Sequence, residues 1–279
     1  MTNRPFRFGV SLLATGSRST WQARARQAED LGYDTLQVPD HLGMPAPFPA
    51  LVSVAEATSL TVGTYVLNAG FYRPALLARD VADTALLTDG RLEVGLGTGA
   101  IAAEFEAAGV PFPSGGARVE GLARTVAEMK QALAAVGVPV PPLLLAGDGD
   151  RMLRLAAREA DIVGLSLLSA TRPGADPAKV LDDRVSFVRM AAGDRLSALQ
   201  LNLFVSTVSV SGEVDLSFAR AAAPDLPEEH LLSLPGVLVG SARTIADRLL
   251  DYRETHGITY LSVLEPAMQE FGKVIELLR

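Results

Sequence analysis

The sequence predicts a (β/α)8 TIM barrel, in which eight parallel strands alternate with helices. Short apolar runs recur along the whole chain, and a longer segment of helical period follows each of them. This alternation is typical of successive βα units. The chain has eight such runs and 279 residues, which are the strand number and an ordinary length for this barrel.

The strands are expected where the apolar runs lie. In chain order they are Arg7–Leu12, Thr35–Val38, Leu60–Leu67, Arg91–Gly95, Pro142–Leu145, Ile162–Leu165, Leu199–Val205 and Tyr260–Val263. The helical segments are Thr20–Leu31, Pro74–Leu87, Arg118–Val136, Asp150–Arg158, Pro177–Ala192, Ala242–His256 and Gln269–Leu278. Glycines in LGYD, TDGRLEV and HGIT end helices directly before the second, fourth and eighth strands, as helix C-termini commonly require.

The remaining segments read as loops on one face of a single domain spanning residues 1–279. Linker-like composition is confined to Pro45–Pro49, Pro111–Gly116 and Arg172–Pro177, which all follow strands, where a barrel places its functional loops. The segment 206–235 fits the βα pattern least well, and VSVSGEVD within it suggests an extra strand. We therefore expect a short insertion at about 206–235.

Composition excludes several classes of function. The chain has no cysteine, which removes disulfide scaffolds, thiolate zinc sites and cysteine nucleophiles. Its three histidines stand alone, so we expect no metal site. Basic residues form no run and the net charge is -7, which argues against nucleic-acid binding. No signal peptide or membrane span is apparent, so we expect a cytoplasmic protein, away from membranes, with a small-molecule substrate.

The glycine-rich motif LEVGLGTGA follows an apolar strand, and its glycines allow a tight turn and close approach of backbone to a ligand. Alone, the motif also resembles the nucleotide loop of a methyltransferase or a loose Rossmann pattern. Those alternatives need a second strand that ends in an acidic residue about 20 residues later. That position is Glu120, within a helical segment. A glycine-rich turn that binds no ligand is a further alternative.

Two other strand ends carry candidate functional residues. In VPDHL, His41 can pass a proton near neutral pH and Asp40 can accept hydrogen bonds, although this composition also suits an ordinary loop or cap. In LLLAGDGDRML, the helix start near Asp150 and the adjacent Arg151 suit a phosphate. Asp148 and Asp150 would repel that phosphate unless they point away, and a plain helix cap is the alternative there.

Taken together, several segments resemble the luciferase-like monooxygenase superfamily, and more narrowly its branch of coenzyme F420-dependent oxidoreductases. The segments are FRFGVSL, LGYDTLQVPDHL, LTVGTYVLNAGFYRPALLARDVADTALLTDGRLEVGLGTG, LLLAGDGDRMLRLAAREADIVGL and VLVGSARTIADRLLDYRETHGITYLSVLEP. The resemblance implies a bacterial luciferase-like barrel with the cofactor across its C-terminal face. Some members bind flavin mononucleotide (FMN) instead of F420. Related barrels often dimerise, so a homodimer is an expected oligomeric state.

The resemblance also implies roles for individual residues. His41 lies near the reactive ring and protonates the substrate. Tyr65 and Val66 align with a backbone bulge, often with a non-prolyl cis peptide, that supports the ring. The positions implied to contact the cofactor are Asp40, Tyr65, Val66, Asn68, Thr98, Gly99, Asp148, Gly149, Arg151 and Met152.

Two departures from the family pattern bear on the substrate. Sugar-phosphate dehydrogenases of the family carry a proton-transferring glutamate and a contacting asparagine where this chain has Ala100 and Ala103. We therefore expect reduction of an activated C=C or C=N bond in a small organic substrate. An FMN-dependent monooxygenase and a cofactor-binding barrel with little catalysis are the alternatives.

Overall fold

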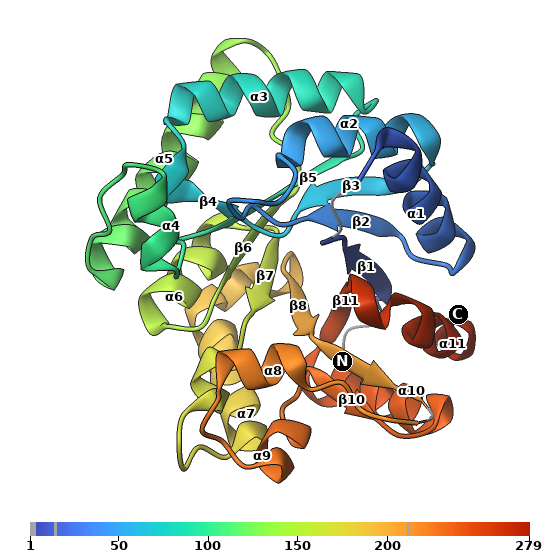
Figure 1. Cartoon of the computed structure of the whole chain (residues 1–279). Coiled ribbons are helices and arrows are strands. Elements are labelled where there is room, and N and C mark those ends of the chain that lie inside the picture. Colours follow the sequence, from blue (N-terminus) through green and yellow to red (C-terminus); the bar gives the residue numbers. More distant parts are fainter. Residues whose placement is uncertain (1–3, 14–15, 211) are drawn as a thin grey trace.

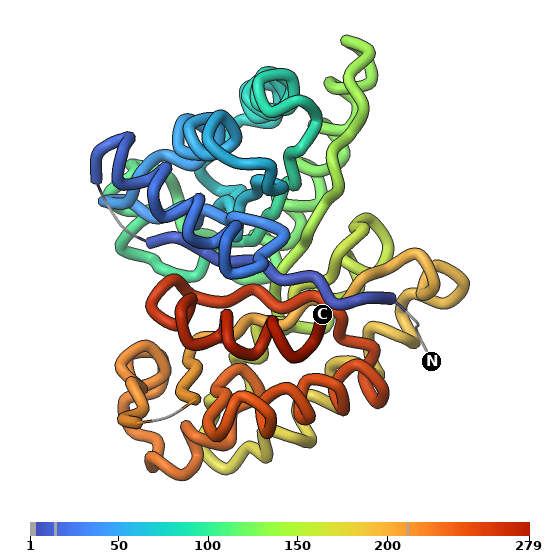
Figure 2. Tube along the Cα trace, turned by 90° about the vertical axis from the view of Figure 1, so that its right-hand side faces the viewer, coloured from blue at the N-terminus to red at the C-terminus, as the bar shows by residue number. Residues whose placement is uncertain are grey.

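A computed structural model describes residues 4–13, 16–210 and 212–279, and it confirms the predicted barrel. The strands form one parallel sheet in the order β3-β2-β1-β11-β8-β7-β6-β5-β4, and an additional pairing of β3 with β5 closes the ring. The short strands β3 and β4 together fill one of eight positions around the barrel, and helices surround them (Figure 1). Figure 2 shows the first half of the chain above the second half.

The barrel strands lie close to the predicted ones. They are β1 (Arg7–Ser11), β2 (Thr35–Val38), β3 (Thr61–Thr64), β4 (Leu67–Asn68), β5 (Leu92–Gly97), β6 (Leu143–Gly147), β7 (Ile162–Leu165), β8 (Gln200–Val205) and β11 (Ile258–Leu264). β2 and β7 have the predicted bounds. The predicted third strand is the one that differs most, because it is split between Thr64 and Leu67.

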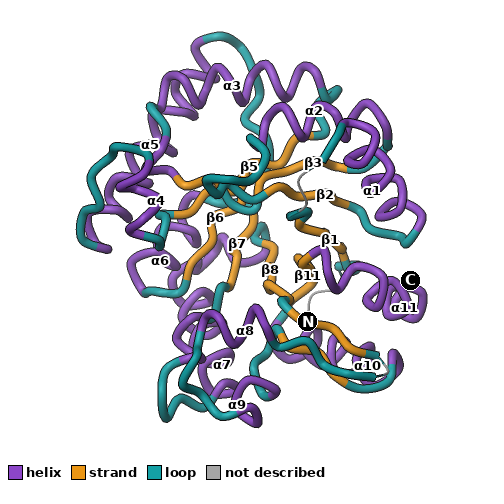
Figure 3. The backbone as a smooth tube through the Cα atoms, viewed as in Figure 1, coloured by secondary structure: helices purple, strands orange, loops and turns teal. Residues whose placement is uncertain are grey.

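The helices cover the outside of the ring of strands (Figure 3). They are α1 (Arg18–Asp30), α2 (Pro47–Ala57), α3 (Pro74–Leu87), α4 (Ala102–Ala107), α5 (Gly115–Ala135), α6 (Asp150–Glu159), α7 (Pro177–Ala192), α8 (Ser217–Ala222), α9 (Glu228–Leu232), α10 (Ala242–Asp251) and α11 (Met268–Leu278). The linker expected at Pro45–Pro49 is wrong in part, because α2 begins at Pro47. Proline fits the first turn of a helix, where its missing N–H is not needed.

The segment around 206–235 forms an excursion from the regular βα pattern. β9 (Thr207–Ser209) pairs in parallel with β10 (Val237–Val239) in a small second sheet, and α8 and α9 lie between them in the chain. The extra strand suggested by VSVSGEVD is β9. A short 3-10 helix, η2 (Leu168–Thr171), follows β7 in the chain.

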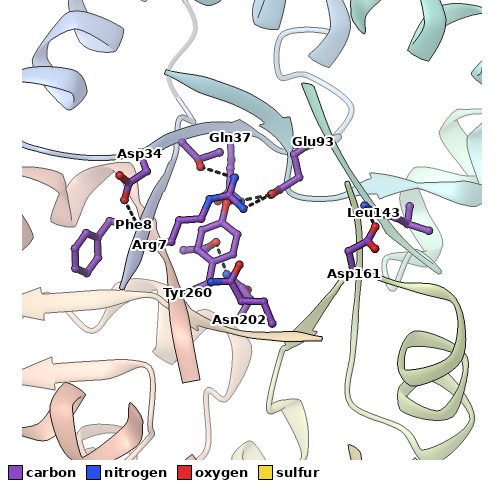
Figure 4. Close-up of polar contacts among 12 residues, drawn as sticks. Arg7, Phe8, Asp34, Gln37, Glu93, Leu143, Asp161, Asn202 and Tyr260 are labelled. Carbon is purple, nitrogen blue, oxygen red and sulfur yellow. Dashed lines mark hydrogen bonds and ion pairs between the residues drawn. The ribbon is translucent and has the colours of Figure 1, made fainter. Parts of the chain in front are cut away.

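A polar network that the sequence did not single out crosses the inside of the barrel (Figure 4). Arg7 of β1 forms an ion pair with Glu93 of β5, with Nη1 and Oε2 2.6 Å apart. The Tyr260 hydroxyl donates to Glu93 Oε1 at 3.0 Å and accepts from Gln37 Nε2 at 2.9 Å. Burial raises the pKa of the Glu93 carboxyl, and the adjacent Arg7 guanidinium opposes that shift. The network ties four strands, β1, β2, β5 and β11, together inside the barrel.

Candidate active site at the C-terminal end of the barrel

The predicted site residues gather at the carboxyl ends of the strands. Asp40 and His41 follow β2, Asn68 ends β4, Thr98 and Gly99 follow β5, and Asp148 follows β6. The carboxyl ends of parallel barrel strands share one face, which is where such barrels carry their active sites.

A backbone bulge separates β3 from β4. The peptide bond between Tyr65 and Val66 is cis, and the Tyr65 hydroxyl donates to Asn202 Oδ1 at 2.8 Å. The bulge packs against the glycine-rich strand β5. A Cβ atom at Gly95 would lie 2.1 Å from the Thr64 carbonyl oxygen, and one at Gly97 would lie 2.8 Å from Val66 Cγ2. These two glycines therefore make room for the bulge, and the closed barrel overrules the methyltransferase and Rossmann alternatives.

Asp40 and Asn68 are brought together beside this bulge. Asp40 Oδ2 accepts a hydrogen bond from the Asn68 backbone N–H at 3.0 Å, and the Tyr72 hydroxyl also bonds to the Asp40 carboxylate. Burial raises the pKa of Asp40, while the bonds from Asn68 and Tyr72 oppose that shift. Burial and the nearby Asp40 raise the pKa of Tyr72.

Gly99 packs directly against the Asn68 side chain. Its φ is +68°, and a Cβ there would lie 2.5 Å from Asn68 Oδ1 and 2.6 Å from Phe105 Cε2. Asn68 Oδ1 accepts from the Gly70 N–H at 3.0 Å, whereas the buried Asn68 Nδ2 has no hydrogen-bond partner among the described residues. The amide is thus held in place with one donor unused.

His41 pairs with a residue to which the sequence assigned no role. His41 Nδ1 lies 2.9 Å from Glu104 Oε1 on α4, and the two side chains are 43% and 17% exposed. A carboxylate at this distance accepts a hydrogen bond from the Nδ1–H group. Nε2 is then the ring atom that is left to exchange a proton with a ligand. Glu104 was visible in the sequence as one of few polar residues in an apolar segment, but its reach to His41 was not.

The acidic residues after β6 point away from the start of α6. Asp148 Oδ2 accepts from the Ser169 N–H at 2.6 Å, and Asp150 Oδ1 lies 2.6 Å from Arg184 Nη1. The N-cap of α6 is Gly149, which provides no side-chain acceptor. The alternative of a plain aspartate cap is therefore wrong, and the first backbone N–H groups of α6 stay available to an anion.

Arg151 and Met152 lie in the first turn of α6 and differ in environment. Arg151 is exposed and reaches α5, where a Cβ at Gly116 would lie 2.4 Å from Arg151 Nη1. Met152 is buried, and its side chain packs against Gly147. Only the backbone of Met152 is therefore placed for a ligand at this helix start.

Four buried polar atoms along this face have no hydrogen-bond partner among the described residues. They are Asn68 Nδ2, Asp148 Oδ1, Ser166 Oγ and Ser169 Oγ. Buried polar groups are nearly always hydrogen-bonded, so these four atoms are candidates for contact with a bound ligand. The sequence missed Ser166, Ser169 and Tyr72, and their only signal was a polar residue close behind an apolar strand or motif.

Two other kinds of feature are absent from the described residues. No helix there is both long and apolar enough to cross a membrane. Nor do three or more histidine, aspartate or glutamate side chains in residues 4–13, 16–210 and 212–279 gather where they could hold a metal ion.

Comparison with known proteins places this face in context. The family model for the luciferase-like monooxygenase domain matches residues 2–183, which is well over half of the chain. The chain is 27% identical over 260 residues to the F420-dependent glucose-6-phosphate dehydrogenase of Kribbella flavida, covering 74% of this chain and 77% of the relative. It is 25% identical over 288 residues to the protein of the same name from Amycolatopsis mediterranei, covering 84% and 86%.

A solved structure agrees on the fold. The coenzyme F420-dependent tetrahydromethanopterin reductase from Methanopyrus kandleri superimposes with a TM-score of 0.76 at 16% identity, over 99% of this chain and 100% of that chain. At this identity the likeness shows the shared barrel alone.

Proposed function

The chain belongs to the luciferase-like monooxygenase family, and from that premise we propose that it is a coenzyme F420-dependent oxidoreductase. It transfers a hydride between the deazaflavin and a small organic substrate, and its preferred reaction is the reduction of an activated C=C or C=N bond. The names of both curated relatives support F420 over FMN as the cofactor.

Unpartnered buried polar atoms at the C-terminal face carry the proposal. Three of them, Asn68 Nδ2, Asp148 Oδ1 and Ser169 Oγ, offer both donors and acceptors to a cofactor. This suits a polar heterocycle with a long side chain, which presents several hydrogen-bonding groups along one face. The residues present therefore fit the cofactor.

Two groups of residues would hold it. Asp40, Tyr65, Val66, Asn68, Thr98 and Gly99 surround the bulge and would support the ring. Gly149, Arg151 and the backbone of Met152 form the start of α6 and would hold a phosphate, with Asp148 beside them. When bound, the deazaflavin supplies or accepts a hydride at its C5 carbon.

His41 supplies the proton that the reduction also requires. One atom of the substrate double bond gains the hydride and the other gains a proton, so charge and atoms balance. Glu104 accepts from His41 Nδ1, which directs Nε2 toward the substrate and stabilises the imidazolium before it gives up its proton. His41 is 43% exposed, so solvent can return the proton afterwards.

The substrate differs from that named for the relatives. At Ala100 and Ala103 this chain carries methyl groups in place of polar side chains that sugar-phosphate dehydrogenases of the family use. An uncharged substrate without phosphate therefore suits this chain better than glucose-6-phosphate.

Cofactor binding and turnover test the proposal separately. The purified protein is titrated with F420 and with FMN, and binding is followed by absorbance and fluorescence. Reduced F420 is then mixed with α,β-unsaturated ketones and imines, and its reoxidation is followed. We expect F420 to bind and to be reoxidised by at least one compound, and His41→Ala to slow this by roughly 100-fold. Tight FMN binding without F420 binding would favour the monooxygenase and overturn the proposal.

A further inference from the structure

A cavity of about 80 Å³ opens beside the bulge, between η2 and α8. Leu167 and Leu168 border it on one side, and Phe218 and Ala222 of α8 border it on the other. Ser166 and Ser206 also line it, and each directly follows a barrel strand, β7 or β8. The cavity therefore belongs to the functional face.

Aromatic side chains connect this cavity to the bulge. Phe204, which lines the cavity, stacks on Tyr65 with ring centroids 6.0 Å apart. Phe218 meets Phe204 edge to face at 5.5 Å. A molecule in the cavity would thus touch the same aromatic group that borders the Tyr65–Val66 peptide.

The lining is mainly apolar and carries no charged side chain. Among the described residues that form it, none carries a charge, and most are leucine, phenylalanine or alanine. Placing a phosphate or carboxylate there would leave a charge without a partner, which is costly. The surrounding residues therefore select against anionic substrates.

One polar atom of the lining is free to recognise a substrate. Ser166 Oγ is buried and has no hydrogen-bond partner among the described residues, whereas Ser206 Oγ donates to the Gly236 carbonyl at 3.4 Å. A serine hydroxyl can donate to a carbonyl or imine and can also accept. Ser166 is thus suited to a polar atom next to the apolar group.

The backbone beside Ser166 is held in a costly conformation. Leu167 has a φ of +50°, which is uncommon for a residue with a branched side chain, and its side chain is buried. Such strain persists where the surroundings fix it, and it is concentrated at ligand-binding positions. It turns Leu167 and Leu168 toward the cavity from consecutive positions.

The volume limits what can enter. The cavity opens to solvent, so its volume of about 80 Å³ limits only the part of a ligand that it encloses. Benzene fills an enclosed apolar cavity of about 150 Å³, so the enclosed part is a smaller group, such as an isopropyl group. Whole ligands usually occupy at least roughly 300 Å³. The cavity therefore receives one part of a substrate.

We propose that this cavity is the specificity pocket for the substrate, receiving a short branched alkyl group while Ser166 Oγ donates to the adjacent carbonyl or imine. The proposal rests on the F420-dependent reduction proposed above. It narrows the substrate class to uncharged enones or imines that carry a small alkyl group.

A direct binding experiment tests the pocket without relying on turnover. The probe is isobutyramide, an unreactive amide with an isopropyl group, and its binding in the presence of F420 is followed by NMR titration. Ala222→Leu, which fills the cavity from α8, should weaken binding by roughly 10-fold or more. Ala221→Leu is the matched control, because Ala221 and Ala222 are both exposed on the same helix and only Ala222 lines the cavity. Ser166→Ala should weaken binding less than Ala222→Leu does.

Turnover then distinguishes the two proposals. With reduced F420, enones bearing an isopropyl group should be reduced at least roughly 10-fold faster, in kcat/KM, than matched enones bearing a benzyl or phosphate group. Ala222→Leu should remove that preference and leave F420 affinity unchanged. If Ala222→Leu and Ala221→Leu have equal effects on isobutyramide binding and on substrate preference, the pocket assignment is overturned. The proposed function then still stands. Failure of F420 to bind overturns the proposed function, and the pocket assignment with it.

Discussion

His41 Nδ1 and Glu104 Oε1 lie 2.9 Å apart, and they join the loop after β2 to helix α4 across the functional face. The two residues are 63 positions apart in the chain. The carboxylate fixes which ring nitrogen of His41 remains available, so the pair resembles other base-and-orienter arrangements in enzymes. In the proposed reaction, Glu104 acts through His41 as a positioning residue.

Glu104→Gln should slow substrate reduction by roughly 10-fold, less than the roughly 100-fold expected for His41→Ala. The amide keeps the shape of the side chain but loses the charge that stabilises the imidazolium. The loss should therefore appear in kcat, with KM and F420 affinity nearly unchanged, whereas a merely structural role would also weaken binding. Glu106→Gln, an exposed change on the same helix, is the control. An unchanged kcat for Glu104→Gln, or a loss in F420 affinity alone, would argue against the positioning role.

Arg151→Gln should weaken F420 binding by roughly 10-fold, because a charge-assisted contact to phosphate is lost from the start of α6. Added salt should shrink the difference between variant and wild type, since screening weakens that contact in the wild type and the variant lacks it. Arg154→Gln is the control, because Arg154 lies one turn on and packs its guanidinium over the Phe187 ring at 5.4 Å. Fluorescence titration of F420 measures both. Equal losses for the two variants would contradict a phosphate site at Arg151.

Much of the barrel could be predicted because its strands and helices follow local patterns. β2, β7, α3 and α7 have the bounds that apolar runs and helical period predict. Helix α2 was missed because a proline-rich start looks like a linker until the apolar residues behind it are buried against the barrel. Tertiary packing therefore determines that this segment is a helix.

The site could be predicted only in outline. The positions of Asp40, His41 and Asn68 at strand ends follow from the alternation of elements. Their partners do not, because Asp40 meets Asn68 and His41 meets Glu104 only after separate βα units close into a ring. Arg7 and Glu93 were missed for the same reason, since their ion pair joins β1 to β5 across the barrel.

Gly99→Ala should destabilise the fold more than Gly109→Ala, although the two glycines have nearly the same φ, +68° and +67°. Both changes force alanine into the left-handed region, which costs about 1 kcal/mol. At Gly99 the new Cβ also meets the Asn68 amide and Phe105, whereas at Gly109 nothing lies within 4 Å. We expect about 1–3 kcal/mol of additional loss at Gly99, together with weaker F420 binding.

Denaturant unfolding of both variants measures this difference, and F420 titration reports the local effect. Gly109→Ala controls for backbone conformation alone. If the two variants lose the same free energy of unfolding, the close approach of Gly99 to Asn68 does not restrict which side chain position 99 can carry.

Arg7→Met should destabilise the protein by about 3 kcal/mol at pH 8, because it leaves the buried Glu93 carboxylate without its cation. The loss should shrink as pH falls. Glu93 already has a raised pKa in the folded protein, and removing Arg7 raises it further, so the folded variant takes up a proton where the unfolded chain does not. Near pH 4.5, the ordinary value for this carboxyl, both states approach the neutral form and the penalty fades.

The double variant Arg7→Met/Glu93→Gln should recover much of the stability at pH 8, since it buries no unpaired charge. Arg18→Met is the control for removing an arginine, because the Arg18–Glu56 pair is 71% and 64% exposed and such pairs contribute about 1 kcal/mol or less. Urea unfolding at pH 5, 6.5 and 8 measures all three. A loss for Arg7→Met that stays constant across this range would mean that Glu93 is not the group left unpaired.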